Sequence, residues 1–314
     1  MKENMHKKRT GAVVRLVIWS LVAIGLAAVL TVGLLVDSFR WNGIINLGGY
    51  KGLDSAKAQE GNGTVSDQIY RLSIDWVDGS VTVLPTDEEK LTIREVSVNG
   101  GEIEESHRMR WLVENGTLRI GYCKPTWWLR GKGKELIVQI PTAWLTDMET
   151  MKVNSVSGEV SLQDINGESS IEVTTVSGHV TANDLQAWGV AVETTSGNVT
   201  VNGTVNWADL DSVSGEIRLN GSARNVDVET VSGEIDLYLQ DTPKDVQIDT
   251  VSGDTTLSLP KDIKGFRVEM DSASGDLTVD FEGTWQSKTF RHGNGSAMIE
   301  IDSVSGDARI LKGS

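Results

Sequence analysis

The sequence has one cysteine and four histidines in 314 residues, and these shortages exclude several kinds of site. Cys123 has no partner for an intrachain disulfide, and it lies far from the N-terminal apolar segment, where a lipid-modified cysteine would stand. His6 lies near the N-terminus, whereas His107, His179 and His292 are scattered without partners at metal-ligand spacing. We therefore expect Cys123 to be a small, half-buried apolar residue and expect no histidine metal centre.

Sequence motifs of common enzyme classes are also missing. The chain has no G-x-G-x-x-G between a strand and a helix and no G-x-x-x-x-G-K-[ST], which excludes the usual nucleotide cofactor sites. It has no G-x-S-x-G, the turn on which many hydrolases carry a nucleophilic serine. We predict no catalytic residues, no enzyme cofactor and no enzymatic activity.

Basic residues are few and unevenly placed. The whole chain carries a net charge of −15, but the first 36 residues carry +4 from Lys2, Lys7, Lys8, Arg9 and Arg15 against Glu3, which leaves −19 for the rest. A domain this acidic repels a phosphate backbone, so nucleic acid is not an expected partner.

Residues 16–36 are 21 apolar or small residues without a charge, enough for a helix to cross a hydrocarbon core of about 30 Å. A cleaved signal peptide is the alternative, but its apolar region is normally shorter and ends in an A-x-A-like site. Because the basic cluster in residues 1–15 precedes this segment, the positive-inside rule predicts a cytoplasmic tail there and an extracellular C-terminal domain. The predicted localisation is the cell membrane, with a single pass.

The region after this segment changes character twice. Residues 37–64 are rich in Gly, Asn and Ser, which predicts a flexible stalk. Residues 65–150 read as short alternating strands broken by Asp-Gly and Asn-Gly turns, and we interpret them as an N-terminal β lead-in or capping region.

Residues 151–314 form a repeat built on a Ser-Gly step, with intervals mostly of 18 to 22 residues. The repeated glycines are Gly158, Gly178, Gly197, Gly215, Gly233, Gly253, Gly275 and Gly306. Apolar residues stand seven and five places before and four places after each glycine, which indicates two short strands per repeat, each with one buried face. The last interval, of 31 residues, predicts an inserted loop or hairpin beside the final repeat.

The alternation of apolar and polar positions alone does not distinguish a row of antiparallel hairpins from a β-solenoid, because both would place the same residues on one face. Eight hairpins would leave a wide apolar face uncovered, whereas a solenoid coil folds its two strands over each other and stacks on the next coil. We therefore predict an all-β, single-stranded β-solenoid with two-sheet coils of 18–20 residues, preceded by one transmembrane helix. The Ser-Gly pair is explained as turn chemistry, since glycine reaches positive φ and serine bonds nearby backbone.

The chain resembles a bacterial putative-adhesin domain family of unknown function, which includes accessory proteins of Lia-type envelope-stress operons. The matching pieces are "LSIDWVDGSVTVLPTDEEKLTI", "KELIVQIP", the repeated "VSGEI" steps and "GNGSAMIEIDSVSGDARI". This resemblance implies a membrane-anchored extracytoplasmic β-solenoid with adhesion or envelope-stress roles and no established chemistry. The long last insertion and the "TWWLRGKGK" loop depart from the family pattern.

Acidic residues recur four places before and one place after the repeated glycine. In stacked coils like charges would lie about 4.8 Å apart, which costs roughly 0.9 kcal/mol per pair in water. One interpretation is a solvated face, and the other is a ladder for Ca²⁺, which favours oxygen ligands. The candidate cation ladder is Asp249, Asp254, Asp271, Asp276, Asp302 and Asp307.

One basic and aromatic stretch stands out within the acidic region. The candidate surface-binding loop is Lys124, Trp127, Trp128, Arg130, Lys132 and Lys134. Tryptophan beside cations suits an anionic lipid surface or sugar rings. The alternative is a loop whose tryptophans cover the open end of the first coil.

These patterns together predict a non-enzymatic envelope protein, an adhesin or accessory protein, whose partner is a cell-wall polymer or an envelope protein. Two alternatives stay open at this point. The first is a regulator of an envelope-stress sensor acting through the membrane helix. The second is a polysaccharide-active enzyme, which would need a cleft lined by acids and aromatics.

Overall fold

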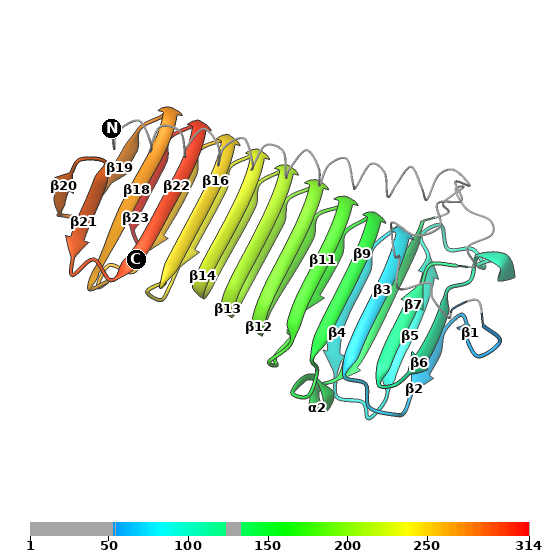
Figure 1. Cartoon of the computed structure of the whole chain (residues 1–314). Coiled ribbons are helices and arrows are strands. Elements are labelled where there is room, and N and C mark those ends of the chain that lie inside the picture. Colours follow the sequence, from blue (N-terminus) through cyan, green and yellow to red (C-terminus); the bar gives the residue numbers. More distant parts are fainter. Residues whose placement is uncertain (1–52, 54, 124–132, 314) are drawn as a thin grey trace. The chain divides into compact units, whose positions relative to one another are not determined.

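The computed structural model describes Leu53 and residues 55–123 and 133–313, and these form two compact units that meet in sequence between Gly189 and Val190. Almost all regular structure is β-strand, which confirms the all-β prediction (Figure 1). The exceptions are a 3₁₀ turn, η1 (Glu105–His107), and a single helical turn, α2 (Thr142–Leu145).

The N-terminal unit consists of two sheets built from strands that pair mainly in parallel. The first sheet has the order β1 (Gln59–Glu60), β6 (Arg110–Glu114), β7 (Thr117–Gly121), β3 (Arg71–Asp78), β9 (Thr150–Ser157) and β11 (Ser170–Ser177). The second has the order β2 (Gly63–Val65), β5 (Leu91–Ser97), β8 (Lys134–Pro141), β4 (Val81–Thr86), β10 (Val160–Gln163) and the start of β12 (Val180–Ser196). Antiparallel strands end both sheets, and most of them lie in residues 65–150, the region predicted to be a lead-in or cap.

The solenoid begins earlier than predicted. Strands β3 and β4 pair in parallel with β9 and β10, and Asp78 aligns with Ser157. Gly79 therefore occupies the place of the repeated glycine, with an Asp-Gly step instead of Ser-Gly. The first coil lies within residues 65–150, which were predicted to be lead-in alone.

The folded region also extends into the predicted stalk. Leu53 is buried, and both β1 and β2 fall within residues 37–64 or at their end. The sequence of this stretch is poor in apolar residues because its short strands lie at sheet edges, where few side chains are buried. The stalk prediction is therefore wrong for residues 59–64.

The C-terminal unit stacks coils in parallel, with the register that the repeat predicts. Val199 of β13 (Val199–Ser214) pairs with Ile217 of β14 (Ile217–Ser232), and Ile217 pairs with Ile235 of β15 (Ile235–Leu239). These partners are separated by one repeat interval, and all three are fully buried. Parallel pairing at that spacing excludes antiparallel hairpins for these repeats.

The order of coils in the C-terminal unit differs from the order in sequence. One sheet runs β13, β14, β16 (Asp245–Ser252), β22 (Ala297–Ser305), β18 (Gly265–Ser274), and the other runs β13, β14, β15, β17 (Thr255–Leu259), β23 (Ala308–Lys312), β19 (Leu277–Val279). The last coil of the chain thus lies between its two predecessors, as the red β22 between yellow and orange strands shows (Figure 1).

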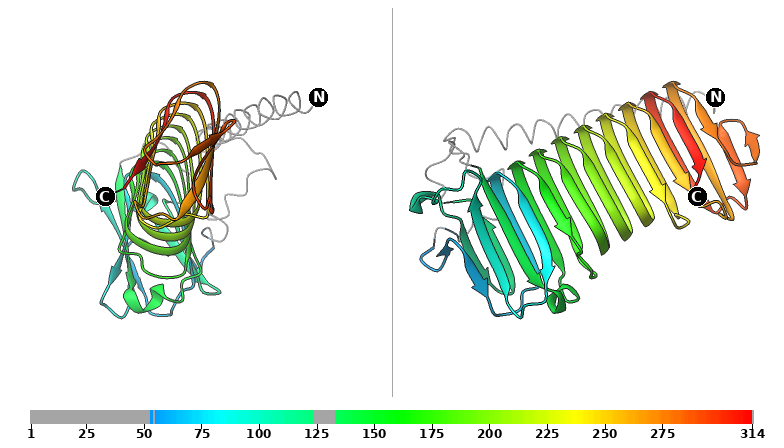
Figure 2. Two further views of the ribbon diagram at one scale, coloured as in Figure 1. Left: turned by 90° about the vertical axis from the view of Figure 1, so that its left-hand side faces the viewer. Right: turned by 180° about the vertical axis from the view of Figure 1, so that it is seen from behind.

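The 31-residue interval holds a capping hairpin. Strand β21 (Thr289–Gly293) pairs antiparallel with the outer edge of β18 and also with β20 (Thr284–Gln286) (Figure 2). Phe266, Phe281 and Phe290 form an aromatic cluster at this end, with ring centroids 5.0 and 6.0 Å apart. The predicted hairpin is present, and its function is to cover an edge that would otherwise be open to another strand.

A column of hydroxyl side chains lies inside the coils, three places before each repeated glycine. The buried members are Ser155, Thr175, Thr194, Ser212, Thr230, Thr250 and Ser303. Their hydroxyl oxygens have no hydrogen-bond partner within the described structure. Such unpaired groups cost folding free energy, so this column lowers stability.

Candidate functional site

The repeated glycines serve the stacking of coils. A Cβ atom on Gly233 would lie 2.1 Å from the carbonyl oxygen of Gly215, and one on Gly253 would lie 2.0 Å from that of Gly233. In the N-terminal unit a Cβ on Gly178 would lie 2.0 Å from the Gly158 carbonyl oxygen. Glycine is required because the turns of neighbouring coils approach more closely than any side chain allows. The sequence analysis explained these glycines by positive φ alone, and this contact was missed.

The serines of the Ser-Gly steps bond to the preceding coil. Ser157 Oγ donates to the carbonyl oxygen of Val77 at 3.2 Å, and Ser177 Oγ donates to that of Val156 at 3.4 Å. The backbone continues the ladder through the turn, where the Gly215 N–H donates to the Ser232 carbonyl. These serines are therefore structural.

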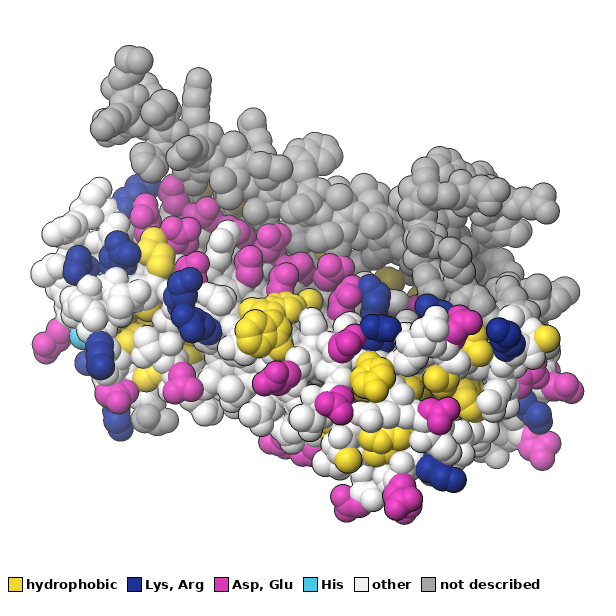
Figure 3. Space-filling view, turned by 60° about the horizontal axis from the view of Figure 1, so that its bottom comes forward, with side chains coloured by type: hydrophobic (Ala, Val, Ile, Leu, Met, Phe, Trp, Pro, Cys, Tyr) yellow, Lys and Arg dark blue, Asp and Glu magenta, His cyan; other side chains and the backbone are white. Residues whose placement is uncertain are grey.

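The acidic columns lie in register on the C-terminal unit. Asp302 pairs with Asp249 on one side and with Asp271 on the other. The turn carboxylates have backbone partners, because Asp254 Oδ1 accepts the N–H of Asp307 at 3.0 Å and Asp307 Oδ1 accepts the N–H of Asp276 at 3.0 Å. A band of Asp and Glu side chains is visible in Figure 3.

Ionisation of these carboxylates is hindered. Burial raises the pKa of Asp302 to about 6, and the carboxylates of Asp249 and Asp271 add to the shift. Burial raises the pKa of Asp211 to about 8, with Asp209 and Glu229 among the charged neighbours. Within residues 53–313, as far as they are described, no group of three His, Cys, Asp or Glu side chains is arranged to hold a metal ion. Calcium binding stays a prediction, which melting curves in chelator and in millimolar calcium would test.

Most of the predicted surface-binding loop lies outside the described residues, namely Lys124, Trp127, Trp128, Arg130 and Lys132. Lys134 is described, and its assignment to a surface loop is wrong. It begins β8 and is only 2% exposed. The strand places it at an inward position, in the same alternation as the buried Leu136 and Val138.

Lys134 forms the centre of a buried polar cluster in the cap. Its Nζ donates to Glu95 Oε2 at 2.8 Å and to the carbonyl oxygens of His107 and Tyr122 at 2.6 Å each, so all three protons are used. It also lies over the rings of Tyr122 and Trp76, 4.1 and 5.1 Å from their centroids. Burial lowers the pKa of Lys134, and the hydrogen bond to Glu95 opposes that shift.

Glu95 is equally well satisfied. Its carboxylate accepts the Met109 N–H at 3.0 Å in addition to the Lys134 ammonium. Cys123, next to this cluster, is a buried thiol that forms no disulfide, and burial raises its pKa. The Lys134 ammonium and the Glu95 carboxylate are thus both paired, and removing either one alone would leave a buried unpaired charge. One sequence signal could have revealed this ion pair. Two oppositely charged residues stand at inward positions of strands in which buried and exposed side chains alternate.

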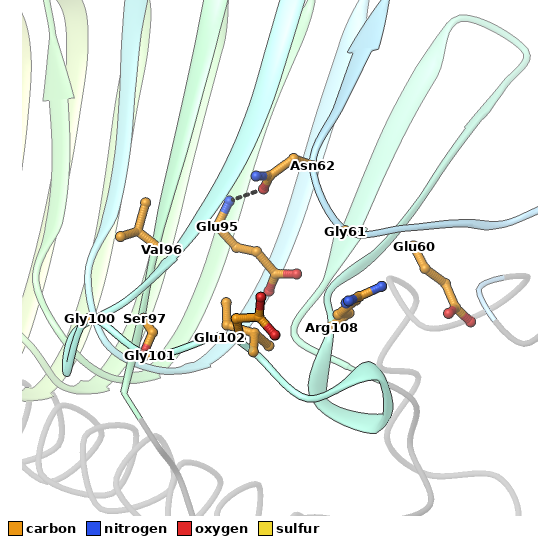
Figure 4. Close-up of a pocket in the computed structure, with 11 residues that line it drawn as sticks. Glu60, Gly61, Asn62, Glu95, Val96, Ser97, Gly100, Gly101, Glu102 and Arg108 are labelled. Carbon is orange, nitrogen blue, oxygen red and sulfur yellow. Dashed lines mark hydrogen bonds between the residues drawn. The ribbon is translucent and has the colours of Figure 1, made fainter.

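A pocket of about 460 Å³ opens beside this cluster (Figure 4). Its walls come from the β1–β2 link, the end of β5 and the following turn, and Asn62 Oδ1 accepts the backbone N–H of Glu95 at 2.7 Å. Three carboxylates, of Glu60, Glu95 and Glu102, line it together with the guanidinium of Arg108. The described lining contains no aromatic side chain, whereas a polysaccharide-active cleft would need one.

The chain was compared with models of known protein families. A model for the Toastrack DUF4097 domain matches residues 69–311. The chain belongs to the Toastrack DUF4097 family. The match starts just before β3 of the first coil and ends in β23, so it spans all the described coils. The resemblance to a β-repeat domain of unknown function is confirmed.

Three solved structures are similar to this Toastrack chain. A crystal structure described as a putative adhesin from Bacteroides fragilis is 14% identical, with a TM-score of 0.46, and the match covers 82% of this chain and 98% of that one. A putative lipid binding protein from Parabacteroides distasonis is 15% identical, with a TM-score of 0.40 and the same coverage. A putative cell adhesion protein from Clostridium sporogenes is 12% identical, with a TM-score of 0.25, covering 81% and 100%. The comparison with curated proteins finds no match.

The predicted membrane segment, residues 16–36, and the basic tail, residues 1–15, lie outside the described residues and stay predictions. In the part of the chain that the structure does describe, no helix is both long and apolar enough to cross a membrane.

Proposed function

We propose that this Toastrack protein is a non-enzymatic scaffold of the cell envelope, anchored by residues 16–36, which presents its coils outside the membrane to a wall polymer or an envelope protein. The observation that carries the proposal is the use of the repeated residues. The glycines, the serines and the turn aspartates at 254 and 307 are all engaged in stacking one coil on the next. What the repeat conserves within this chain is therefore architecture.

The scaffold leaves its outward side chains free to differ from coil to coil. The position that is Asp236 in one coil is Arg218 in the coil before it and Thr256 in the coil after it, although all three backbones pair in register. Varied, partly exposed side chains on a fixed frame suit recognition of a partner. Anchoring through the N-terminus fits the +4 charge of residues 1–15 and the apolar run that follows them, residues 16–36.

The test is capture of envelope components by the full-length protein and by residues 37–314. Purified wall polymers, solubilised membrane proteins and anionic vesicles are each offered to both forms. Capture of a polymer or an envelope protein by both forms supports the scaffold. Capture that requires residues 1–36 supports instead a regulator of a membrane sensor. Release of reducing sugar from a wall polymer would overturn the non-enzymatic assignment.

A further inference from the structure

One coil of the C-terminal unit is longer than its neighbour at the edge opposite the Ser-Gly turns. Strands β13 and β14 match residue for residue through this edge, where Thr204 pairs with Ser222. In the next coil Gly221 pairs with Leu239, but Asn225 pairs with Asp245. Three residues in one coil, 222–224, thus oppose five in the next, and these five, residues 240–244, form a projecting loop.

The projecting loop is held firmly. The Gln240 N–H donates to the Gly221 carbonyl at 2.7 Å, and the Lys244 N–H donates to the Arg224 carbonyl at 2.7 Å. Ser222 Oγ donates to Asp241 Oδ2 at 2.7 Å. Pro243 is buried, which fixes the backbone between the two anchors. The loop is therefore a preformed wall.

A pocket of about 400 Å³ lies between this loop and the edge of β13 and β14. Its polar lining consists of Thr204, Ser222, Arg224, Asp241, Thr242 and Lys244. The side chains of Arg224 and Lys244 are exposed. The described ion pairs of residues 190–313 join Arg218 to Glu216 and Asp236, and Lys288 to Asp271, so neither pocket cation takes part in one.

Residues 190–314 contain ten Lys and Arg residues against 21 Asp and Glu residues, and of these ten only Arg218 and Lys288 form a described ion pair. What distinguishes Arg224 and Lys244 is that both line one pocket, together with hydroxyl side chains. Guanidinium binds oxyanions through paired hydrogen bonds, and an ammonium adds a point charge. The surrounding acids weaken the long-range attraction of any polyanion, so affinity for a phosphate group would have to come from contacts inside the pocket.

We propose that this pocket binds the phosphodiester of a glycerol-phosphate or sugar-phosphate unit. Arg224 and Lys244 contact the two non-bridging oxygens, and the hydroxyls of Thr204 and Thr242 together with Asp241 bond the flanking hydroxyl groups. This inference rests on the proposed function, in which this unit is exposed to the cell envelope. It adds to that function the chemical class of the ligand. A wall polymer and a phospholipid headgroup are two sources of the same chemistry.

The experiment uses the full-length protein in a neutral detergent and measures its affinity for soluble poly(glycerol phosphate). The double variant Arg224→Gln/Lys244→Gln is expected to bind at least tenfold more weakly. Arg267→Gln/Arg309→Gln removes the same charge from exposed positions outside the pocket and is expected to change the affinity less than twofold. Equal losses in the two double variants would reduce the effect to net charge and overturn the site.

Parallel arms identify the source and the ligand class. Nanodiscs containing phosphatidylglycerol are compared with phosphatidylcholine nanodiscs, and binding that only the pocket variant loses supports the site with a lipid source. Polygalacturonate, a carboxylate polymer, is expected to bind at least tenfold more weakly than the phosphate polymer, and equal binding would overturn the choice of phosphate. If the pocket variant still captures envelope partners as the unchanged protein does, the pocket assignment fails while the scaffold function stands.

Discussion

Replacing Gly233 with alanine tests the reason for the glycine column. The added Cβ would lie 2.1 Å from the Gly215 carbonyl oxygen, about 1 Å closer than such atoms approach in proteins. The contact is with backbone, so no side chain can move aside. Gly233 does not need a positive φ, so this substitution introduces the steric effect without backbone strain.

The size of the destabilisation can be worked out from the contacts between the two turns that the added Cβ would break. Opening the two turns by about 1 Å breaks the hydrogen bonds from the Gly215 N–H to Ser232 and from the Ile217 N–H to Glu234, now 3.3 and 2.9 Å long. Two such bonds contribute about 1–3 kcal/mol, and overpacking adds about 1–3 kcal/mol. The expected loss is about 2–6 kcal/mol of unfolding free energy.

The assay is urea unfolding followed by far-ultraviolet circular dichroism. Gly101→Ala is the matched control, because its Cβ would meet nothing within 4 Å, and it is expected to change the free energy by less than about 0.5 kcal/mol. A loss below about 0.5 kcal/mol for Gly233→Ala would show that the coils can part at their turns. The steric explanation of the repeat would then be refuted.

Three further predictions concern buried polar groups. Thr230→Val is expected to stabilise the protein by about 1–2 kcal/mol in the same assay because the unpaired hydroxyl is removed, and a destabilised variant would reveal a hidden partner. Lys134→Met is expected to cost about 3–5 kcal/mol, and adding Glu95→Leu is expected to recover much of it, whereas additive losses would contradict the buried ion pair. Because the folded pKa values of Asp211 and Asp302 are raised, the folded state binds more protons, and stability is expected to fall as pH rises from about 4 to 8. Thermal melts across that range check the sign, and a constant or rising melting temperature would contradict it.

Some features of the candidate sites could be predicted from the sequence and others could not. Turn glycines were found because their spacing repeats, although their close contact was not. Lys134 was misplaced because it follows a Gly-Lys-Gly stretch that reads as a loop, whereas its partner Glu95 lies 39 residues away in sequence. The pocket beside residues 240–244 was not predicted. The interval between repeated glycines is two residues longer in this coil than in the one before, but the interval alone does not show where the extra residues project.

The sequence by itself determined the all-β class, the coil length and the buried columns. These properties depend on the alternation of side chains within each repeat and on the turn between its strands, and both are local. Only the tertiary structure decided which coil stacks on which. Because all repeats have the same columns, the pattern of one repeat does not show which other repeat it packs on. In the structure β22 lies between β16 and β18, and the hairpin that pairs with the outer edge of β18 makes β18 the last coil strand of its sheet.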